Sequence, residues 1–293
     1  MAKLRKVECR TKGLILFLCR DGEVSLSRAK NFAIQMANYE NNSLKKKKST
    51  TFAALNDNIY IYNIMKKALA VYGIAYLALL LFVLALQYIY PKTHLHLLLN
   101  SIHTGFEDTF FKYYSMLAEW PLYVLALLPL FWKKYGITLF FALSELTGGA
   151  FLQILKHTFC FDRPVCVFES HPEIALPLVE GVNMHHSNSF PSGHASTFFV
   201  FFTCCALILT YLYQQKDPLC RNRRTWIVMN ISMVILLMLA ALGAYSRVYL
   251  SQHFLLDVCV GSIIGFISPC LFFYFGRNKI LKIGELSKTQ EIK

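Results

Sequence analysis

The chain has 293 residues, of which 55% are hydrophobic and 16% are charged, and its mean hydropathy is +0.42. These values exclude an ordinary soluble domain and a disordered chain, and they indicate an integral membrane protein. The formal net charge is +13, but the basic residues gather at the ends of apolar segments and form no stripe with interleaved aromatic residues. We therefore expect the lipid bilayer, and not nucleic acid, as the partner.

Residues 1–67 form a polar, basic segment that includes the run Lys45–Lys48. Its apolar stretch, Gly13–Cys19, is far shorter than the ~20 residues that cross a bilayer. We predict a basic cytoplasmic tail, partly disordered, over 1–67. A second hypothesis takes Met65 as the functional start, because two lysines and the first apolar run follow it. Loss of activity in a chain that begins at Met65 would exclude this second hypothesis.

Six apolar runs follow, each near the ~20 residues that span the hydrocarbon core. They predict an all-α, polytopic membrane protein with six transmembrane helices in one domain over 68–276. Glu119 and Pro121 interrupt the second run, which membrane helices tolerate. The runs cover 68–90, 114–132, 136–155, 196–213, 225–245 and 256–276.

The segment between the first two runs, 91–112, mixes leucine and phenylalanine with polar residues. This pattern predicts interfacial amphipathic helices that anchor the chain in the membrane, with lipid access as an alternative role.

The lysines and arginines are distributed unevenly over the two faces that six helices define. All but five of the 30 fall on the side of the termini. By the positive-inside rule, both termini are cytoplasmic, including a basic tail over 277–293, and the opposite face is extracytoplasmic. The five basic residues of that face are Lys92, Lys112, Lys156, Arg163 and Arg247.

Three short segments concentrate polar residues at the extracytoplasmic ends of the predicted helices. Phe190–Thr197 places Pro191, Ser192, Gly193 and His194 before an apolar run, as in an anion-binding helix N-terminus. Singly, each segment has a plainer explanation, such as a snorkelling cation or a helix cap. Together they predict a site, because convergent polar groups at a membrane face are rarely structural. The other two segments are Lys156 to Arg163-Pro164, and Ser246-Arg247 to His253 and Asp257.

The chemistry of these side chains suits a phosphate ester. Lys156, Arg163 and Arg247 are able to neutralise and orient phosphoryl oxygens, and backbone N–H groups near Ser192 and Gly193 add donors.

The remaining three groups suit nucleophilic and acid–base chemistry. Asp257 follows His253 by four residues, so on a helix the two share a face and the carboxylate fixes the imidazole tautomer. His253 is then free to act as a nucleophile, and His194 to protonate the leaving oxygen. No carboxylate cluster that would hold Mg²⁺ accompanies these residues, so we expect no metal and no cofactor.

These motifs resemble the signature of the type-2 phosphatidic acid phosphatase superfamily, which includes membrane lipid phosphatases, glucose-6-phosphatases and vanadium haloperoxidases. The resemblance covers 156–257 and the six-helix layout. It implies a phosphohistidine at His253, with Asp257 as its orienting partner and His194 as the acid and base. It also implies that the phosphate is bound by Lys156, Arg163, Ser192, Gly193 and Arg247.

The expected function is therefore metal-independent hydrolysis of a membrane lipid phosphate or pyrophosphate at the extracytoplasmic face. Bacterial undecaprenyl-pyrophosphate, phosphatidylglycerol-phosphate and lipid A phosphatases are the nearest in kind, which suggests a bacterial inner membrane. Two alternatives stay open: a lipid phosphotransferase that uses the same phosphohistidine, and a non-catalytic lipid-binding or transport protein. The lipid and the oligomeric state also stay open.

Two features beside the motifs allow further interpretations. The nine cysteines show no zinc-ligand spacing, and five of them lie in or beside apolar segments, but Cys160 and Cys166 flank Arg163 where an oxidising compartment would permit a disulfide. The loop 165–190 is expected to cover the site as an exposed polar segment, with a metal site as the alternative that loss of activity on chelation would favour. Its ionisable residues are Glu169, His171, Glu173, Glu180, His185 and His186.

Overall fold

The computed structural model describes residues 69–171, 173–216, 223–281 and 283, and every regular element in these ranges is a helix. The predicted tail over 1–67, the start at Met65 and most of 277–293 lie outside the described residues. The helices are Leu69–Ile89, α3 (Lys92–Leu99), α4 (Gly105–Met116), α5 (Pro121–Leu127), the 3-10 helix η1 (Leu128–Trp132), α6 (Tyr135–Thr158), α7 (Pro164–Glu169), α8 (Gly193–Lys216), α9 (Arg223–Tyr249) and α10 (Leu255–Ile280).

Five helices are long and apolar enough to cross a membrane, and the bent pair formed by α4 with α5 and η1 passes the same test when it is taken as one broken span, which gives up to six. The all-α, polytopic membrane fold is thus confirmed. The five are Leu69–Ile89, Tyr135–Thr158, Gly193–Tyr213, Trp226–Tyr249 and Leu255–Arg277.

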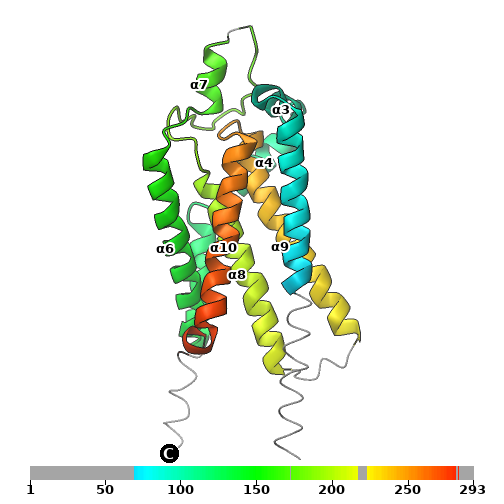
Figure 1. Cartoon of the computed structure of the whole chain (residues 1–293), viewed down its shortest axis with the longest axis vertical. Coiled ribbons are helices and arrows are strands. Elements are labelled where there is room, and N and C mark those ends of the chain that lie inside the picture. The colour runs from blue at the N-terminus through cyan, green and yellow to red at the C-terminus, as the bar shows by residue number, and fades with distance from the viewer. Residues whose placement is uncertain (1–68, 172, 217–222, 282, 284–293) are drawn as a thin grey trace, which may run out of the picture. The chain divides into compact units, whose positions relative to one another are not determined.

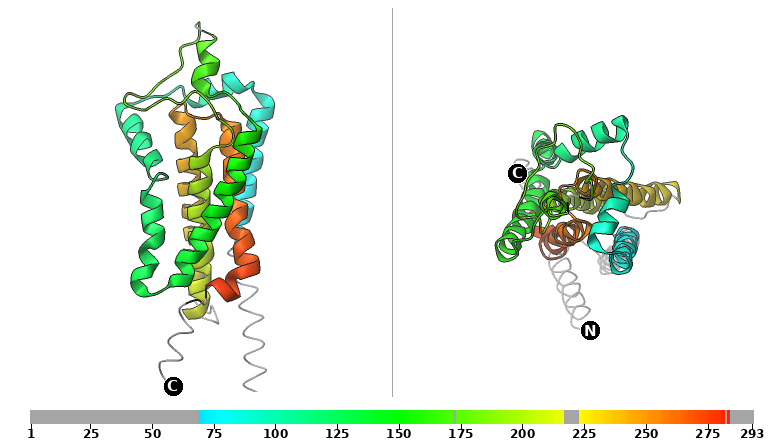
Figure 2. Two further views of the ribbon diagram at one scale, coloured as in Figure 1. Left: turned by 90° about the vertical axis from the view of Figure 1, so that its left-hand side faces the viewer. Right: turned by 90° about the horizontal axis from the view of Figure 1, so that it is seen from above.

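The second span differs from its prediction. It begins at Gly105 and not at 114, and it bends by 48° between α4 and α5, as the left view of Figure 2 shows. Its start was missed because this part of the sequence contains polar residues such as Asp108. In the structure Asp108 has polar partners: it accepts a hydrogen bond from Tyr249 (2.7 Å) and lies 2.7 Å from His103. The break falls where expected, because Pro121 begins α5 and has no N–H to continue the helical ladder.

Helix α8 is the most enclosed span, with 72% of its most apolar stretch buried, against 11% for Leu69–Ile89. It packs against α6, α9 and α10 (Figure 1), and its Phe198 and Ala206 are fully buried. The first turn of α8 therefore has a fixed position relative to the ends of the surrounding helices.

Close backbone contacts between α8 and α10 fix this position further. A Cβ atom on Gly261 would collide with the carbonyl oxygen of Ser192, and one on Gly265 would collide with that of Ser196. Glycine is required here because the two backbones approach too closely for any side chain. The start of α8 and the first turns of α10 are thus held side by side.

We predict that Gly261→Ala destabilises the protein by about 1–3 kcal/mol, since backbone must move to admit the methyl group. The unfolding midpoint in detergent, followed by tryptophan fluorescence, should fall by about 2–4 °C for each kcal/mol. Gly149→Ala in α6 is the matched control, because nothing lies within 4 Å of the added Cβ. Equal midpoints for the two variants would show that the contact of Gly261 with Ser192 is not tight.

Candidate active site

The three motif segments meet at the end of the helices nearest α7 (Figure 1). Four of the other predicted site residues, namely Lys156, Arg163, Arg247 and His253, lie within electrostatic range of His194. Lys156 lies in the last turn of α6, and Arg163 directly precedes α7. Ser192 precedes α8, which begins with Gly193 and His194. Arg247 lies in the last turn of α9, His253 in the α9–α10 loop, and Asp257 in the first turn of α10.

The loop between α9 and α10 carries His253 and is buried at every residue from Leu250 to Phe254. The backbone N–H groups of Gln252 and His253 both donate to the carbonyl oxygen of Arg247, at 3.0 and 3.1 Å. From the other side, Arg163 Nη1 donates to the carbonyl oxygen and to Oε1 of Gln252, both at 3.1 Å. His253 is therefore held between two arginines by hydrogen bonds that involve its own backbone and that of its neighbour.

Helix α3 and Asn100, which directly follows it, contact the same loop. Asn100 Nδ2 donates to Ser251 Oγ at 2.6 Å, His96 Nε2 lies 3.3 Å from the same oxygen, and Ser251 Oγ donates to the carbonyl oxygen of Pro177 at 2.9 Å. Ser251 adopts a left-handed backbone conformation (φ 51°), which side chains rarely tolerate without such support.

Asp257 connects the loop to both flanking segments. Its Oδ2 accepts hydrogen bonds from Ser189 Oγ (2.5 Å) and from the N–H of Phe254 (3.0 Å), and its carbonyl oxygen accepts one from the N–H of Ser192 (3.0 Å). His253 Nδ1 lies 3.7 Å from Oδ2, which is longer than a hydrogen bond.

His253 and Asp257 lie close together, but not for the reason that their spacing in the sequence predicted. His253 and Asp257 were expected to share the face of one helix, but α10 begins at Leu255 and His253 precedes it. The two side chains approach because His253 lies in the loop directly before α10, and the carboxylate of Asp257 in the first turn of α10 turns back to accept a hydrogen bond from the N–H of Phe254.

The second histidine has a similar arrangement. His194 Nε2 lies 3.8 Å from Glu119 Oε1, which belongs to the break between α4 and α5. The same part of the chain contributes Ser115, whose Oγ accepts a hydrogen bond from Arg247 Nη1 at 2.5 Å. Both histidines therefore have a carboxylate behind one ring nitrogen, which leaves His253 Nε2 and His194 Nδ1 for a ligand.

Several of these partners were not identified from the sequence. Glu119 was noticed only as a carboxylate within a span, and Ser115, Ser189 and Gln252 carry no signal, because serine and glutamine are common at helix ends and loops. A carboxylate in a membrane helix usually faces protein or water, so this rule could have assigned Glu119 to the site.

The phosphate-binding candidates differ in how they are held. Ser192 is fully buried, its N–H is bonded to Asp257, and its Oγ accepts from the N–H of Ala195 (3.4 Å), so it caps α8. The space beside Gly193 is open, since a Cβ there would meet nothing within 4 Å. Lys156 is half-buried, and its ammonium group has no hydrogen-bond or ion-pair partner among the residues that the structure describes.

The segment after α7 lies over these groups. Lys112 Nζ donates to the carbonyl oxygen of Glu180 (3.1 Å), and Arg163 Nε to that of Ser187 (2.9 Å). The exposed His185 lies near the cations: burial and the positive charges of Arg163, Arg247 and Lys156 lower its pKa.

The structure also bears on the disulfide between Cys160 and Cys166 and on the metal site in the loop 165–190 that the sequence allowed. Cys160 and Cys166 are free thiols, and Cys166 Sγ donates to the carbonyl oxygen of His186 at 3.0 Å. Within the described ranges, no three His, Cys, Asp or Glu side chains are grouped so that they could hold a metal ion.

Electrostatics favour the neutral form of His253, whose side chain is 3% exposed. Burial is the main cause that lowers its pKa to about 4, and the charges of Arg247 and Arg163 lower it further, against the opposing effect of Asp257. A neutral imidazole has a free nitrogen lone pair, so His253 has the form that a nucleophile needs at neutral pH.

We predict that the His253 imidazole stays neutral from pH 8 down to 5.5 and gains a proton only near pH 4. Protonation removes the lone pair, so the nucleophilic form is lost as the pH falls through this lowered pKa. Nitrogen-15 NMR of histidine-labelled protein would measure the midpoint, with His253→Gln to assign the signal. Arg163→Gln should raise the midpoint, because it removes a nearby positive charge. A wild-type midpoint at or above 6.5 would contradict this electrostatic arrangement.

This chain is similar to known proteins. A family model described as PAP2 superfamily matches residues 137–281, which run from α6 through α10 and contain all eight predicted site residues. The crystal structure of Aquifex aeolicus LpxE is similar, with 24% sequence identity and a TM-score of 0.46, over 64% of this chain and 96% of that chain. No curated protein matches the chain. Through residues 137–281 the chain belongs to the PAP2 superfamily, and it is a membrane-embedded phosphatase of that family.

Proposed function

We propose that the protein hydrolyses a lipid phosphate or pyrophosphate through a phosphohistidine on His253. The observation that carries the proposal is the pairing of each histidine with a carboxylate, 3.7 Å for His253 with Asp257 and 3.8 Å for His194 with Glu119, beside three cations. Arg247 Nε is also buried without a hydrogen-bond partner among the described residues. Such groups are costly unless a ligand compensates them, and a phosphate anion would do so.

In the first step, His253 Nε2 attacks phosphorus and the bond from phosphorus to the lipid oxygen breaks. His194 gives its proton to that oxygen, so a lipid alcohol leaves as a neutral molecule, and the lipid monophosphate from a pyrophosphate leaves with one negative charge fewer. Lys156, Arg163 and Arg247 stabilise the negative charge on the other phosphoryl oxygens.

In the second step, a water molecule gives a proton to His194 and attacks phosphorus. The phosphorus–nitrogen bond breaks, inorganic phosphate leaves, and His253 returns to its neutral form. Both charge stabilisation and proton transfer are supplied by side chains, which supports a mechanism without a metal ion or other cofactor.

The position of the site supports a lipid substrate. It lies where the spans α6, α8, α9 and α10 begin or end, so the headgroup of a membrane lipid reaches it while the chains stay in the bilayer. We propose that this end is extracytoplasmic and that the segments 1–67 and 277–293 are cytoplasmic tails of the domain 68–276, because basic residues are concentrated on the opposite face. A bacterial inner membrane fits this arrangement.

We predict that His253→Ala lowers phosphate release from lipid phosphates by at least ~10³-fold, because it removes the nucleophile. The assay uses purified protein in detergent with a chelator, a panel of phosphatidic acid, phosphatidylglycerol phosphate and polyprenyl pyrophosphate, and vanadate as inhibitor. His171→Ala is the matched control, since His171 is exposed and contacts Glu173 in the loop.

Three outcomes would contradict parts of this proposal. Vanadate-sensitive release that survives His253→Ala would exclude His253 as the nucleophile. Loss of wild-type activity on chelation would favour a metal site. Phosphate that appears on a second lipid, and not in solution, would replace hydrolysis with phosphate transfer.

A further inference from the structure

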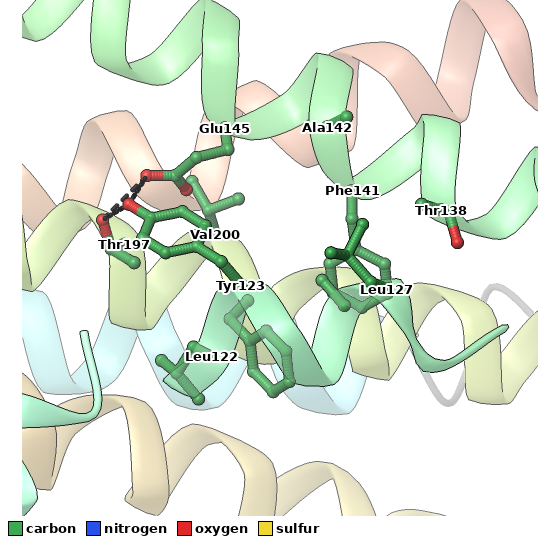
Figure 3. Close-up of a pocket in the computed structure, with 11 residues that line it drawn as sticks. Leu122, Tyr123, Leu127, Thr138, Phe141, Ala142, Glu145, Thr197 and Val200 are labelled. Carbon is green, nitrogen blue, oxygen red and sulfur yellow. Dashed lines mark hydrogen bonds between the residues drawn. The ribbon is translucent and has the colours of Figure 1, made fainter. Parts of the chain in front are cut away.

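A cavity of about 140 Å³ lies between α5, α6 and α8, within the membrane-spanning part of the protein. Its lining is largely apolar, but three polar side chains, those of Tyr123, Glu145 and Thr197, point toward one another at one end (Figure 3). Tyr123 and Leu127 are 40% and 49% exposed. Because these lining residues are exposed on a membrane-spanning surface, the cavity is accessible from the hydrocarbon phase.

The hydrogen bonds of this cluster use only one oxygen of the carboxyl group. Thr197 Oγ1 donates to Glu145 Oε1 at 2.7 Å, and Tyr123 OH donates to the same oxygen at 3.0 Å. In the part of the chain that the structure describes, Glu145 Oε2 has no hydrogen-bond partner and the carboxyl group has no ion-pair partner. If Glu145 served only to connect α5, α6 and α8, its Oε2 atom would have no function.

The surroundings determine what this oxygen offers to a ligand. An unpaired carboxylate in hydrocarbon is far more costly than a neutral carboxyl group, which carries one O–H donor. With Oε1 accepting two hydrogen bonds, the donor belongs on Oε2. The cluster therefore presents one hydrogen-bond donor to a ligand in the apolar cavity.

The cavity begins about one helical turn after His194 in α8. Thr197 follows His194 by three residues in α8, on the same face and about 4.5 Å further along the helix axis. Helix α8 leads from the site into the membrane, so a lipid whose phosphate lies at His253 has its next few bonds at the level of Thr197 and Glu145. In acylated lipids, the ester or amide carbonyl groups occur at this distance from the phosphate.

We propose that Glu145 donates a hydrogen bond to an acyl carbonyl oxygen of the substrate and thereby selects acylated lipid phosphates over polyprenyl phosphates. The proposal rests on the proposed function, since it places the phosphate of the lipid at His253. Ester-linked and amide-linked lipids share the carbonyl acceptor, whereas a polyprenyl chain has none. Acylated lipids are preferred because a bound polyprenyl phosphate would leave the O–H donor of Glu145 without an acceptor.

A second cavity provides room for the acyl chain. It has a volume of about 530 Å³, shares Phe141 and Phe201 with the first, and continues along α5, η1 and α8 to Trp132. Its lining is apolar apart from Lys134 at the far end. The two cavities together form an apolar path from the level of Glu145 toward the opposite end of the spans.

The test compares two phosphatidic acids with the same chain length, one diacyl and one dialkyl, which differ only in the ester carbonyl groups. Wild-type kcat/KM should be about three- to tenfold higher for the diacyl lipid, as expected for one net hydrogen bond. In Glu145→Leu this ratio should fall to about 1. Glu145→Gln keeps an N–H donor of similar shape and should retain the preference. Leu146→Ala, which alters a 70% exposed neighbour outside the cavity lining, is the matched control and should leave the ratio unchanged.

Equal wild-type kcat/KM for the two lipids would overturn the proposal, and this comparison requires no variant to fold. A preference that persists in Glu145→Leu would overturn it as well. An N-acyl sphingoid phosphate added to the panel distinguishes amide from ester carbonyl groups. Failure of the proposed function has a different signature, because hydrolysis of both lipids would then survive His253→Ala.

Discussion

The arrangement of the site depends on one buried acidic residue, Asp257. A carboxylate inside a membrane protein is stable only when hydrogen bonds and positive charge compensate it. The Asp257 carboxylate meets this condition by accepting hydrogen bonds from the N–H of Phe254, where it caps α10, and from the Ser189 hydroxyl in the segment before α8. The backbone carbonyl oxygen of the same residue accepts a hydrogen bond from the N–H of Ser192 at the start of α8. Side chain and backbone of Asp257 together therefore join the segments that carry His253 and His194.

The three cations have a different relation to the fold. Arg163 and Arg247 are held by Gln252 and Ser115, yet they lie near each other and near two histidines, where like charges repel. Unlike the contacts of Asp257, this convergence does not stabilise the fold, and a phosphate anion would neutralise it. Local charge repulsion of this kind is typical of binding sites that are completed only by their ligand.

Sequence patterns predicted those parts of the structure that follow local rules. Apolar length located the spans, and the spacing of Arg247, His253 and Asp257 indicated a candidate site, because each signal lies within one segment. The start of the second span was missed because Asp108 is compensated by Tyr249, which is distant in sequence. Ser115 was missed for the same reason: its partner, Arg247, lies on another helix, and no local pattern encodes a contact between helices.

The most direct test of His253 as the nucleophile is to trap the phosphorylated enzyme. His194→Ala would be mixed with a phosphate ester that has a good leaving group, because the first step then needs no acid while the second still lacks its base. Acid-free quenching and peptide mass spectrometry should find one phosphate on His253, at near-stoichiometric occupancy. Phosphate on another residue, or release of inorganic phosphate in a single turnover with no phosphorylated histidine at any time, would contradict the mechanism.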